Sequence, residues 1–170
     1  MPQALPDQAS ARMQPLPETA SRLLDMRRQL AGDALRAAIA RDPGLGTRYD
    51  ATMLRTFTRD YEEHLSQLAA SLATGDAAPM IAHVDTAVPL FRRRSVPLED
   101  VATLLLGMLD AVRAALPPDE GAAATSVVEE GLGALRRPRH LAGNRPGNPI
   151  VRFLWKGAGY LERDGRGQSR

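Results

Sequence analysis

The feature that most constrains the fold is a stripe of large apolar side chains that repeats every three or four residues. The stripe consists of Leu54, Phe57, Tyr61, Leu65, Leu68 and Leu72. This spacing places the six side chains on one face of an α-helix, while the residues between them are mostly charged or polar. The sequence therefore predicts an amphipathic helix over about residues 50–72, with one face in a hydrophobic core.

The same kind of spacing predicts a helix before this one and another after it. The first should run over about residues 18–41, where Gly32 is expected to divide it in two and the Asp42-Pro43-Gly44 sequence to end it. The later helix should cover about residues 78–92. Pro89 lies inside it and lacks the backbone N–H of a helical residue, so we expect a kink or an early end.

Two more helices complete the prediction. One spans about residues 98–116, begins with Pro97 as its first helical residue, and is apolar over much of its circumference, so it should lie at the centre. The other spans about residues 119–137. Because no alternating apolar pattern occurs and aromatic residues make up only 4% of the sequence, we expect an all-α fold, a single bundle of five or six helices.

Composition divides the chain into four segments. Residues 1–17 are proline-punctuated and should form a flexible leader, residues 18–137 the helical bundle, residues 138–149 a basic linker rich in proline and glycine, and residues 150–170 an aromatic basic tail. The sequence has no cysteine, no apolar run long enough to span a membrane, and no apolar signal core. A cytoplasmic protein is therefore expected.

Charge is distributed unevenly along the chain. Residues 136–170 contain nine basic and two acidic residues, whereas residues 1–135 contain 13 basic and 18 acidic ones. The candidate partner-binding residues lie in this basic part and are Arg152, Phe153, Leu154, Trp155, Lys156 and Tyr160. Large aromatic side chains on a tethered segment suit docking on another protein. The segment could equally pack on its own bundle, and nucleic acid is a weaker alternative because no recognised binding motif accompanies the charge.

The three histidines do not have the spacing of a metal site on one helix. His64, His83 and His140 are far apart in sequence, so no two of them occupy neighbouring turns. An inward His83 could ligate haem in a helical pocket, and the alternative is a boundary histidine with one satisfied hydrogen bond. His64 lies beside the apolar stripe, but the residues that follow it lack the lysine-glycine pair of phosphotransfer bundles.

The remaining charged residues give no catalytic pattern. Acidic residues occur as adjacent pairs: Glu62-Glu63, Glu99-Asp100, Asp119-Glu120 and Glu129-Glu130. Neighbours on a helix point about 100° apart, so these pairs are expected on solvated faces or at helix N-termini. The Arg92-Arg93-Arg94 run could bind an anion, or it could simply complement the C-terminal end of a helix dipole. We therefore expect a protein that is not an enzyme, although scattered acidic residues leave an assembled active site as a third alternative.

Residues 23–116 resemble the helical sensor domains of bacterial stress-response regulators, the globin-like, non-haem N-terminal domains of stressosome proteins. The resemblance is carried by the Asp42-Pro43-Gly44 break, the helix at 54–72 with Tyr61 and His64, and the Val96-Pro97 start of a leucine-rich helix. It implies a dimer that receives a signal without catalysis. Those regulators normally carry an output domain, whereas a basic tail follows here.

Two functional hypotheses follow from these patterns. The first is a non-enzymatic helical adaptor or regulatory protein, without a cofactor, that docks on a protein partner or larger assembly through its C-terminal aromatic tail. The alternative is a globin-like sensory domain that acts as a dimer and either binds no ligand or binds haem through His83.

Overall fold

The computed structural model describes residues 13–141, and in this range all regular secondary structure is α-helical. The helices are α1 (Pro17–Arg41), α2 (Leu45–Arg48), α3 (Ala51–Thr74), α4 (Ala78–Arg93), α5 (Leu98–Ala115), α6 (Pro118–Leu135) and α7 (Pro138–Leu141). The prediction of an all-α bundle is thus confirmed. The short helices α2 and α7 were not predicted, since four residues carry too little periodicity to be recognised.

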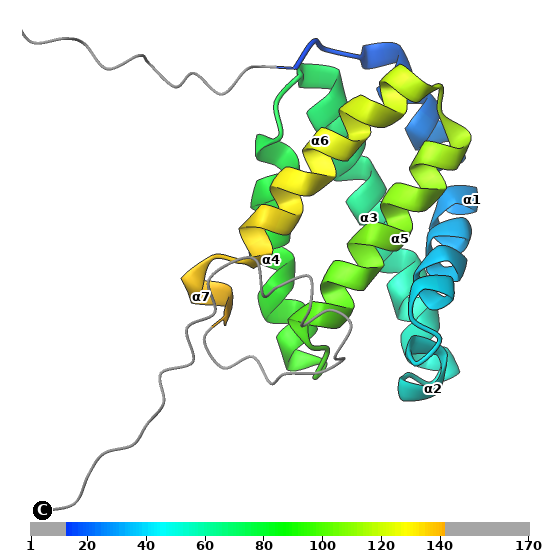
Figure 1. Ribbon diagram of the computed structural model, residues 1–170, viewed down its shortest axis with the longest axis vertical. Helices are drawn as coiled ribbons and strands as arrows, with labels where there is room; N and C mark the ends of the chain where they lie inside the picture. The colour runs from blue at the N-terminus through cyan, green and yellow to red at the C-terminus, as the bar shows by residue number, and fades with distance from the viewer. Residues whose placement is uncertain (1–12, 142–170) are drawn as a thin grey trace, which may run out of the picture.

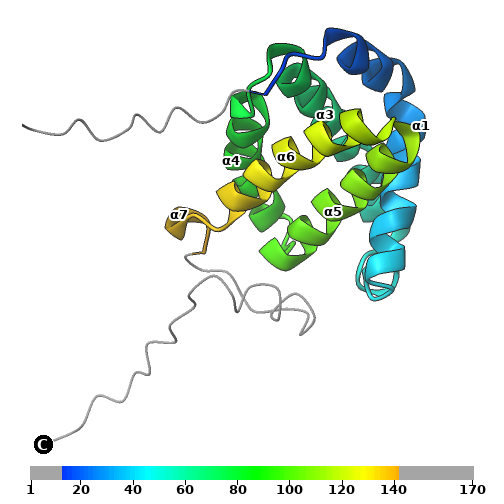
Figure 2. The same ribbon diagram turned by 45° about the horizontal axis from the view of Figure 1, so that its top comes forward.

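The long helices pack as a bundle in which α5 is central (Figure 1). Helix α1 packs mainly against α3 and α5, and α6 packs against α5 and α4. Turning the molecule shows α7 on the α4 side of the bundle, away from α1 (Figure 2). None of the helices between residues 13 and 141 combines the length and the apolar content needed to cross a membrane.

Helix α5 is the most enclosed element, as its apolar circumference predicted. Thirteen of its 18 residues are buried, among them Leu105, Met108 and Val112. Because side chains on nearly every side of this helix avoid water, it requires neighbours all around, and α1, α4 and α6 supply them.

Helix α3 follows its predicted stripe closely. The side chain of Asp50 caps its start by accepting a hydrogen bond from the backbone N–H of Met53 at 2.7 Å. At its end Gly75 adopts the left-handed conformation, with φ of 69°, which glycine tolerates without a steric penalty. Five of the six stripe residues are buried, and Leu54 is half-buried.

Neither Gly32 nor Pro89 ends its helix. Helix α1 continues through Gly32. Ala31 and Ala34, on either side of this glycine, are fully buried in the core, so the residues before and after Gly32 pack there as one helix. That burial outweighs the roughly 1 kcal/mol that glycine costs inside a helix. Helix α4 likewise continues past Pro89 to its end at Arg93, with Pro89 on the exposed side. Pro97 precedes α5 as its N-cap and is not its first helical residue.

The bundle extends beyond the boundaries expected for it. At the N-terminal side the backbone N–H of Leu16 donates to the carbonyl of Leu72 at 2.7 Å, and Met13 packs on the core, so residues 13–16 belong to the bundle and not to a leader. At the other end residues 138–141 form α7 and are not part of a linker. Residues 1–12 and 142–149 lie outside the described residues.

Helices α1 and α5 cross at a point where only small residues fit. A Cβ atom placed on Gly107 would lie 2.6 Å from the backbone nitrogen of Ala38 and 2.7 Å from the carbonyl oxygen of Ala34. These are backbone atoms and cannot yield as a flexible side chain can. Glycine at position 107 therefore sets the distance between the two helices.

We expect Gly107→Ala to lower the free energy of unfolding by about 2 kcal/mol, because the added methyl group forces α1 away from α5. Gly133→Ala is the matched control, since Gly133 lies in helix α6 and no atom of another helix comes within 4 Å of the point that its Cβ would occupy. That variant should be stabilised by up to about 1 kcal/mol. Urea denaturation of both variants tests the crossing, and equal effects at the two sites would contradict it.

Candidate functional site

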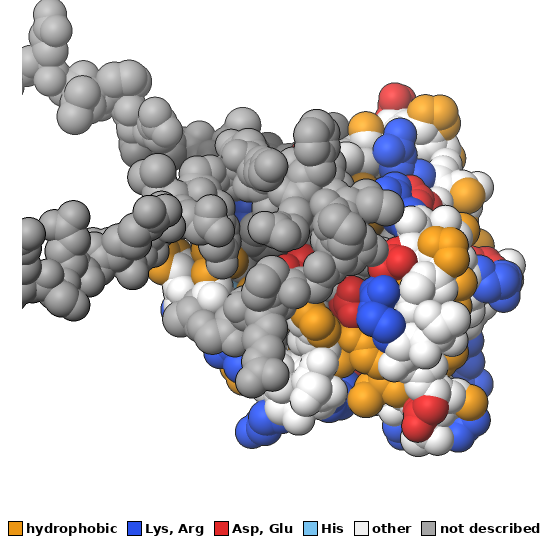
Figure 3. All heavy atoms as spheres, turned by 60° about the horizontal axis from the view of Figure 1, so that its bottom comes forward, with side chains coloured by type: hydrophobic (Ala, Val, Ile, Leu, Met, Phe, Trp, Pro, Cys, Tyr) orange, Lys and Arg blue, Asp and Glu red, His pale blue; other side chains and the backbone are white. Residues whose placement is uncertain are grey.

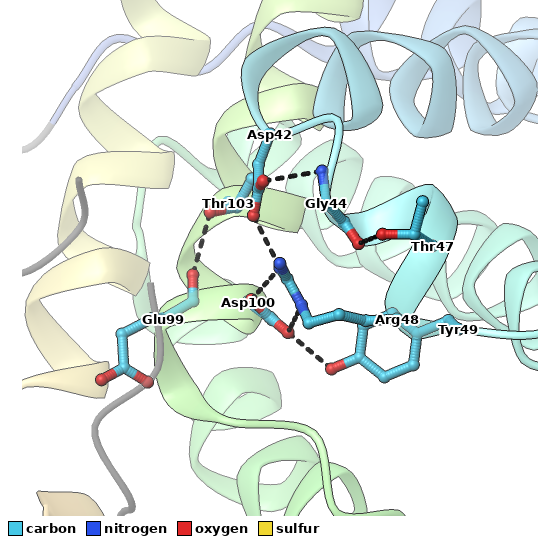
Figure 4. Close-up of polar contacts among 8 residues, drawn as sticks. All are labelled: Asp42, Gly44, Thr47, Arg48, Tyr49, Glu99, Asp100 and Thr103. Carbon is cyan, nitrogen blue, oxygen red and sulfur yellow. Dashed lines mark hydrogen bonds and ion pairs between the residues drawn. The ribbon is translucent and has the colours of Figure 1, made fainter. Parts of the chain in front are cut away.

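An ionic cluster whose two carboxylates, Asp42 and Asp100, are buried joins α2 to the start of α5 (Figure 4). The guanidinium of Arg48 donates to Asp42 Oδ2 at 2.6 Å and to Asp100 Oδ1 at 2.7 Å. The hydroxyl of Tyr49 donates to Asp100 Oδ2 at 2.6 Å, and Asp42 Oδ1 accepts from the backbone N–H of Gly44 at 3.0 Å. Asp100 is only 2% exposed, so its charge depends on these partners.

The electrostatics of this cluster favour a structural role. Burial raises the pKa of Tyr49, and the Asp100 carboxylate raises it further, so the phenol stays protonated and donates. Burial lowers the pKa of Arg48, but the hydrogen bonds to Asp42 and Asp100 outweigh this and the pKa of Arg48 is raised. Tyr49 and Arg48 are thus both held in the protonated form that the carboxylates require, and neither is prepared to exchange a proton at neutral pH.

This cluster adds a role to one of the acidic pairs. Glu99 and Asp100 lie in the first turn of α5, as predicted for helix N-terminal charges, but they are buried and not on a solvated face. Asp100 is drawn inward because Arg48 and Tyr49, which lie 52 and 51 residues earlier in the chain, supply a cation and a donor. Only the folded arrangement reveals those partners.

Two of the histidines meet between α3 and α4. His64 Nδ1 lies 2.6 Å from His83 Nε2, and the two rings are tilted by 71°. His64 is buried, 4% exposed, beside the rings of Tyr61 and Phe91, whereas His83 is half-buried. Spacing along the chain carries no signal for this pair, because the two residues lie on different helices. Their inward positions on two adjacent helices were the one available hint.

Both imidazoles are held in the neutral form. Burial, together with the neighbouring His83, lowers the pKa of His64 to about 3. Burial also lowers the pKa of His83, although the carboxylates of Glu63 and Asp60 oppose the shift. With both rings neutral, one nitrogen of the pair donates its proton and the other accepts it.

The histidine pair bears on the haem hypothesis for His83. Its Nε2 atom faces His64, so an iron atom bound there would have to displace the His64 ring. Between residues 13 and 141 no group of three or more histidine or carboxylate side chains is arranged to hold a metal ion. In this structure the two imidazoles contact each other.

A second polar centre holds α7 on the bundle, and we call it the Asp85 anchor. The carboxylate of Asp85 on α4 contacts Arg137 at 2.6 Å, His140 Nε2 at 2.8 Å, and the guanidinium of Arg139. Arg92, two turns further along α4, donates to the carbonyl oxygen of His140 at 2.7 Å. The imidazole of His140 is buried by these contacts, so α7 is fixed to α4 from several directions.

The carboxylate of Asp85 carries a negative charge in the Asp85 anchor. Burial raises the pKa of Asp85, but the hydrogen bonds from Arg139 and His140 and the charges of Arg137 and Arg139 outweigh it. The pKa of Asp85 is therefore lowered, and its carboxylate stays ionised at neutral pH. Local patterns put Arg137 at the end of a helix and His140 in a linker, so they could not reveal this centre.

Two residues of the arginine run at the end of α4, Arg92 and Arg94, make contacts inside the protein. Arg92 binds α7, and Arg94 forms an ion pair with Asp60 of α3 at 2.6 Å while lying 6.0 Å from the ring centre of Phe91. Arg92 and Arg93 lie in the last turn of α4, where basic residues complement the helix dipole, and the contacts of Arg92 and Arg94 inside the protein were in neither interpretation of this run. Helix α4 thus contacts α3 through His83, and α7 through Asp85 and Arg92.

The predicted partner-binding residues, Arg152, Phe153, Leu154, Trp155, Lys156 and Tyr160, lie outside the described residues. The face drawn in Figure 3 shows acidic, basic and apolar side chains interspersed wherever the described atoms are visible, with no single sign of charge prevailing. Comparison with known protein families finds no matching family, and no curated protein matches the sequence significantly.

We expect Asp100→Asn to lower the free energy of unfolding by about 2 kcal/mol, because it removes the carboxylate charge that Tyr49 binds and one of the two carboxylates that bind Arg48. The loss should be smaller than for a fully enclosed pair, since the Arg48 side chain is 38% exposed. Asp110→Asn is the matched control on the same helix: its ion pair with Arg41 is half-exposed on both sides and should contribute less than about 1 kcal/mol. Chemical denaturation measures both, and a larger loss at Asp110 would contradict the assignment.

Because the histidine pair is neutral in the folded protein, we expect the free energy of unfolding to fall as the pH is lowered from 7.5 to 5. The folded-state pKa values of His64 and His83 lie below the unfolded value, so the unfolded chain takes up protons that the folded chain refuses, and stability falls as the pH decreases below about 6.5. His64 alone should contribute a loss of about 2 kcal/mol between pH 7.5 and 5. Urea denaturation across this range measures the slope, and the His64→Gln/His83→Gln variant should remove most of it. An unchanged slope in that variant would refute the assignment.

Proposed function

We propose that this chain is a non-enzymatic adaptor or regulatory protein whose helical bundle carries a C-terminal segment that binds a protein partner. The observation that supports the proposal is the Asp85 anchor. It fixes Arg137, Arg139 and His140 on α4 directly before the residues that carry the aromatic cluster. The bundle thus determines the point from which residues 142–170 continue.

The composition of residues 142–170 fits this role. Within this stretch Phe153, Trp155 and Tyr160 account for three of the seven aromatic residues of the protein. Tryptophan and tyrosine provide a large contact area with few rotatable bonds, and for that reason they are enriched among residues that dominate binding energy. Arg152 and Lys156 flank the first two aromatics with positive charge.

Charge indicates the kind of partner. Basic residues prevail after Leu135, and two of those at the start of this stretch, Arg137 and Arg139, share the single charge of Asp85. Arg145, Arg152 and Lys156 follow the anchor, and only Glu162 and Asp164 are acidic in the rest of the chain. An apolar groove with an acidic rim on another protein would complement this segment.

Trp155→Ala tests the proposal in a pull-down with the full-length chain as bait, followed by titration of the partner that is captured. If Trp155 is a central contact, the affinity should fall by about 30-fold, which corresponds to about 2 kcal/mol. Leu90→Ala is the control, since Leu90 is a large apolar side chain that is 43% exposed on the bundle. Equal binding by the wild type and Trp155→Ala would contradict the proposal.

A truncation after Leu141 separates docking from self-packing. Because α7 belongs to the bundle, the cut must follow residue 141 to leave the Asp85 anchor complete. If residues 142–170 serve a partner, the truncated protein should have the melting temperature of the full chain. A large loss of thermal stability would instead mean that Phe153 and Trp155 form part of the core, and it would overturn the proposal.

A further inference from the structure

Four arginines gather where the C-terminal ends of α4 and α6 meet α7. They are Arg92 and Arg93 in the last turn of α4, Arg137 after the end of α6, and Arg139 in α7. Arg92 donates to the carbonyl oxygen of His140 at 2.7 Å. Arg137 and Arg139 both contact the carboxylate of Asp85 on α4. These contacts bring three segments of the chain together, and we call the four arginines the arginine surface.

The positive charge of the arginine surface exceeds the negative charge that faces it. Asp85 is the one carboxylate between residues 13 and 141 that forms an ion pair with any of the four arginines. Glu129 and Glu130, in the second half of α6, form no ion pair with them within the same range. Because the C-terminal ends of α4 and α6 contribute about half a negative charge each, a surplus of about two positive charges remains.

The guanidinium groups of this surface keep N–H donors that the described residues do not use. Arg137 contacts Asp85 through Nη1 and Arg139 through Nη2, and their side chains are 41% and 58% exposed. Arg93 is exposed and forms no hydrogen bond or ion pair with the described part of the chain. Each guanidinium presents its donors in a planar fork that matches the two oxygens of a carboxylate. The surface can therefore bind further acidic groups.

The surroundings of this surface favour carboxylates on a short protein segment over nucleic acid. Residues 1–135 contain 13 basic and 18 acidic residues, so a long polyanion that extends beyond the arginine surface meets a bundle of its own charge. Apart from histidine, Phe91 is the one aromatic residue of α4, α6 and α7, and it is buried. Bases therefore cannot stack there, although stacking supplies much of the affinity for single strands.

We propose that the arginine surface is a docking site for an acidic segment of a protein, whose carboxylates pair with Arg93 and Arg139. Asp85 has a positioning role, because it holds Arg137 and Arg139 side by side at the point from which residues 142–170 continue. That the acidic segment belongs to the same partner rests on the function proposed above. Such a partner is bound at two places, by the aromatic residues of the C-terminal stretch and by the folded bundle.

Nuclear magnetic resonance titration of the full-length chain with an acetylated hexaglutamate peptide at about 0.15 M salt tests the docking site. The backbone amide signals of Arg93 and Arg139 should shift more than those of α1. In Arg93→Glu the dissociation constant should rise about tenfold, because the substitution turns an attraction into a repulsion. Arg139→Gln, which leaves Arg137 and His140 in contact with Asp85, should raise it about threefold.

Arg28→Glu is the matched control. Arg28 on α1 is exposed and, like Arg93, forms no hydrogen bond or ion pair with the described residues, so its substitution changes the net charge equally and leaves the arginine surface intact. The dissociation constant should change by less than about twofold, since α1 lies away from α7 (Figure 2) and salt screens distant charges.

Three results would overturn the docking site. The first is an equal loss of affinity in Arg93→Glu and Arg28→Glu, which would mean that the peptide senses net charge alone. The second is equal binding of hexaglutamate and hexaglutamine by the wild type. The third is tighter binding of hexathymidylate that Arg93→Glu abolishes, which would assign the surface to nucleic acid. Trp155→Ala should bind hexaglutamate as the wild type does, so a failure of the function proposed above is told apart from a failure of the docking site.

Discussion

The burial of α5 on nearly all sides is the constraint on which the rest of the structure depends. A helix that is apolar around most of its circumference cannot lie at a surface, so α1, α4 and α6 are required to enclose it. Their approach is limited by side-chain size, and Gly107 against Ala34 and Ala38 allows α1 to come close enough. The buried Asp100 then demands a cation and a donor at the start of α5, and the turn containing α2 supplies both.

Much of this architecture was predictable from periodicity. The stripe from Leu54 to Leu72 determined α3 to within a few residues, and the apolar circumference of residues 98–116 placed α5 at the centre. Local rules failed where packing overrides propensity. Gly32 did not interrupt α1, and Pro89 did not end α4, because buried neighbours or an exposed position removed the cost that those residues usually impose.

The polar centres were much less accessible to sequence reasoning. His64 and His83 are 19 residues apart, Arg48 and Asp100 are 52 apart, and Asp85 and His140 are 55 apart. Helical spacing relates residues three or four positions apart, so none of these pairs leaves a local pattern. The charge asymmetry that drew attention to the C-terminal part did have a structural counterpart, since Arg137 and Arg139 are gathered around Asp85.

The Asp85 anchor depends on a single acidic residue that serves three basic partners. The guanidinium groups of Arg137 and Arg139 share this one carboxylate, which offsets their mutual repulsion. Removing that carboxylate would therefore do more than delete an attraction, since the two guanidinium groups would then repel each other. One substitution at Asp85 would leave the bond from Arg92 to the carbonyl oxygen of His140 as the polar contact that still ties α7 to α4 among those described.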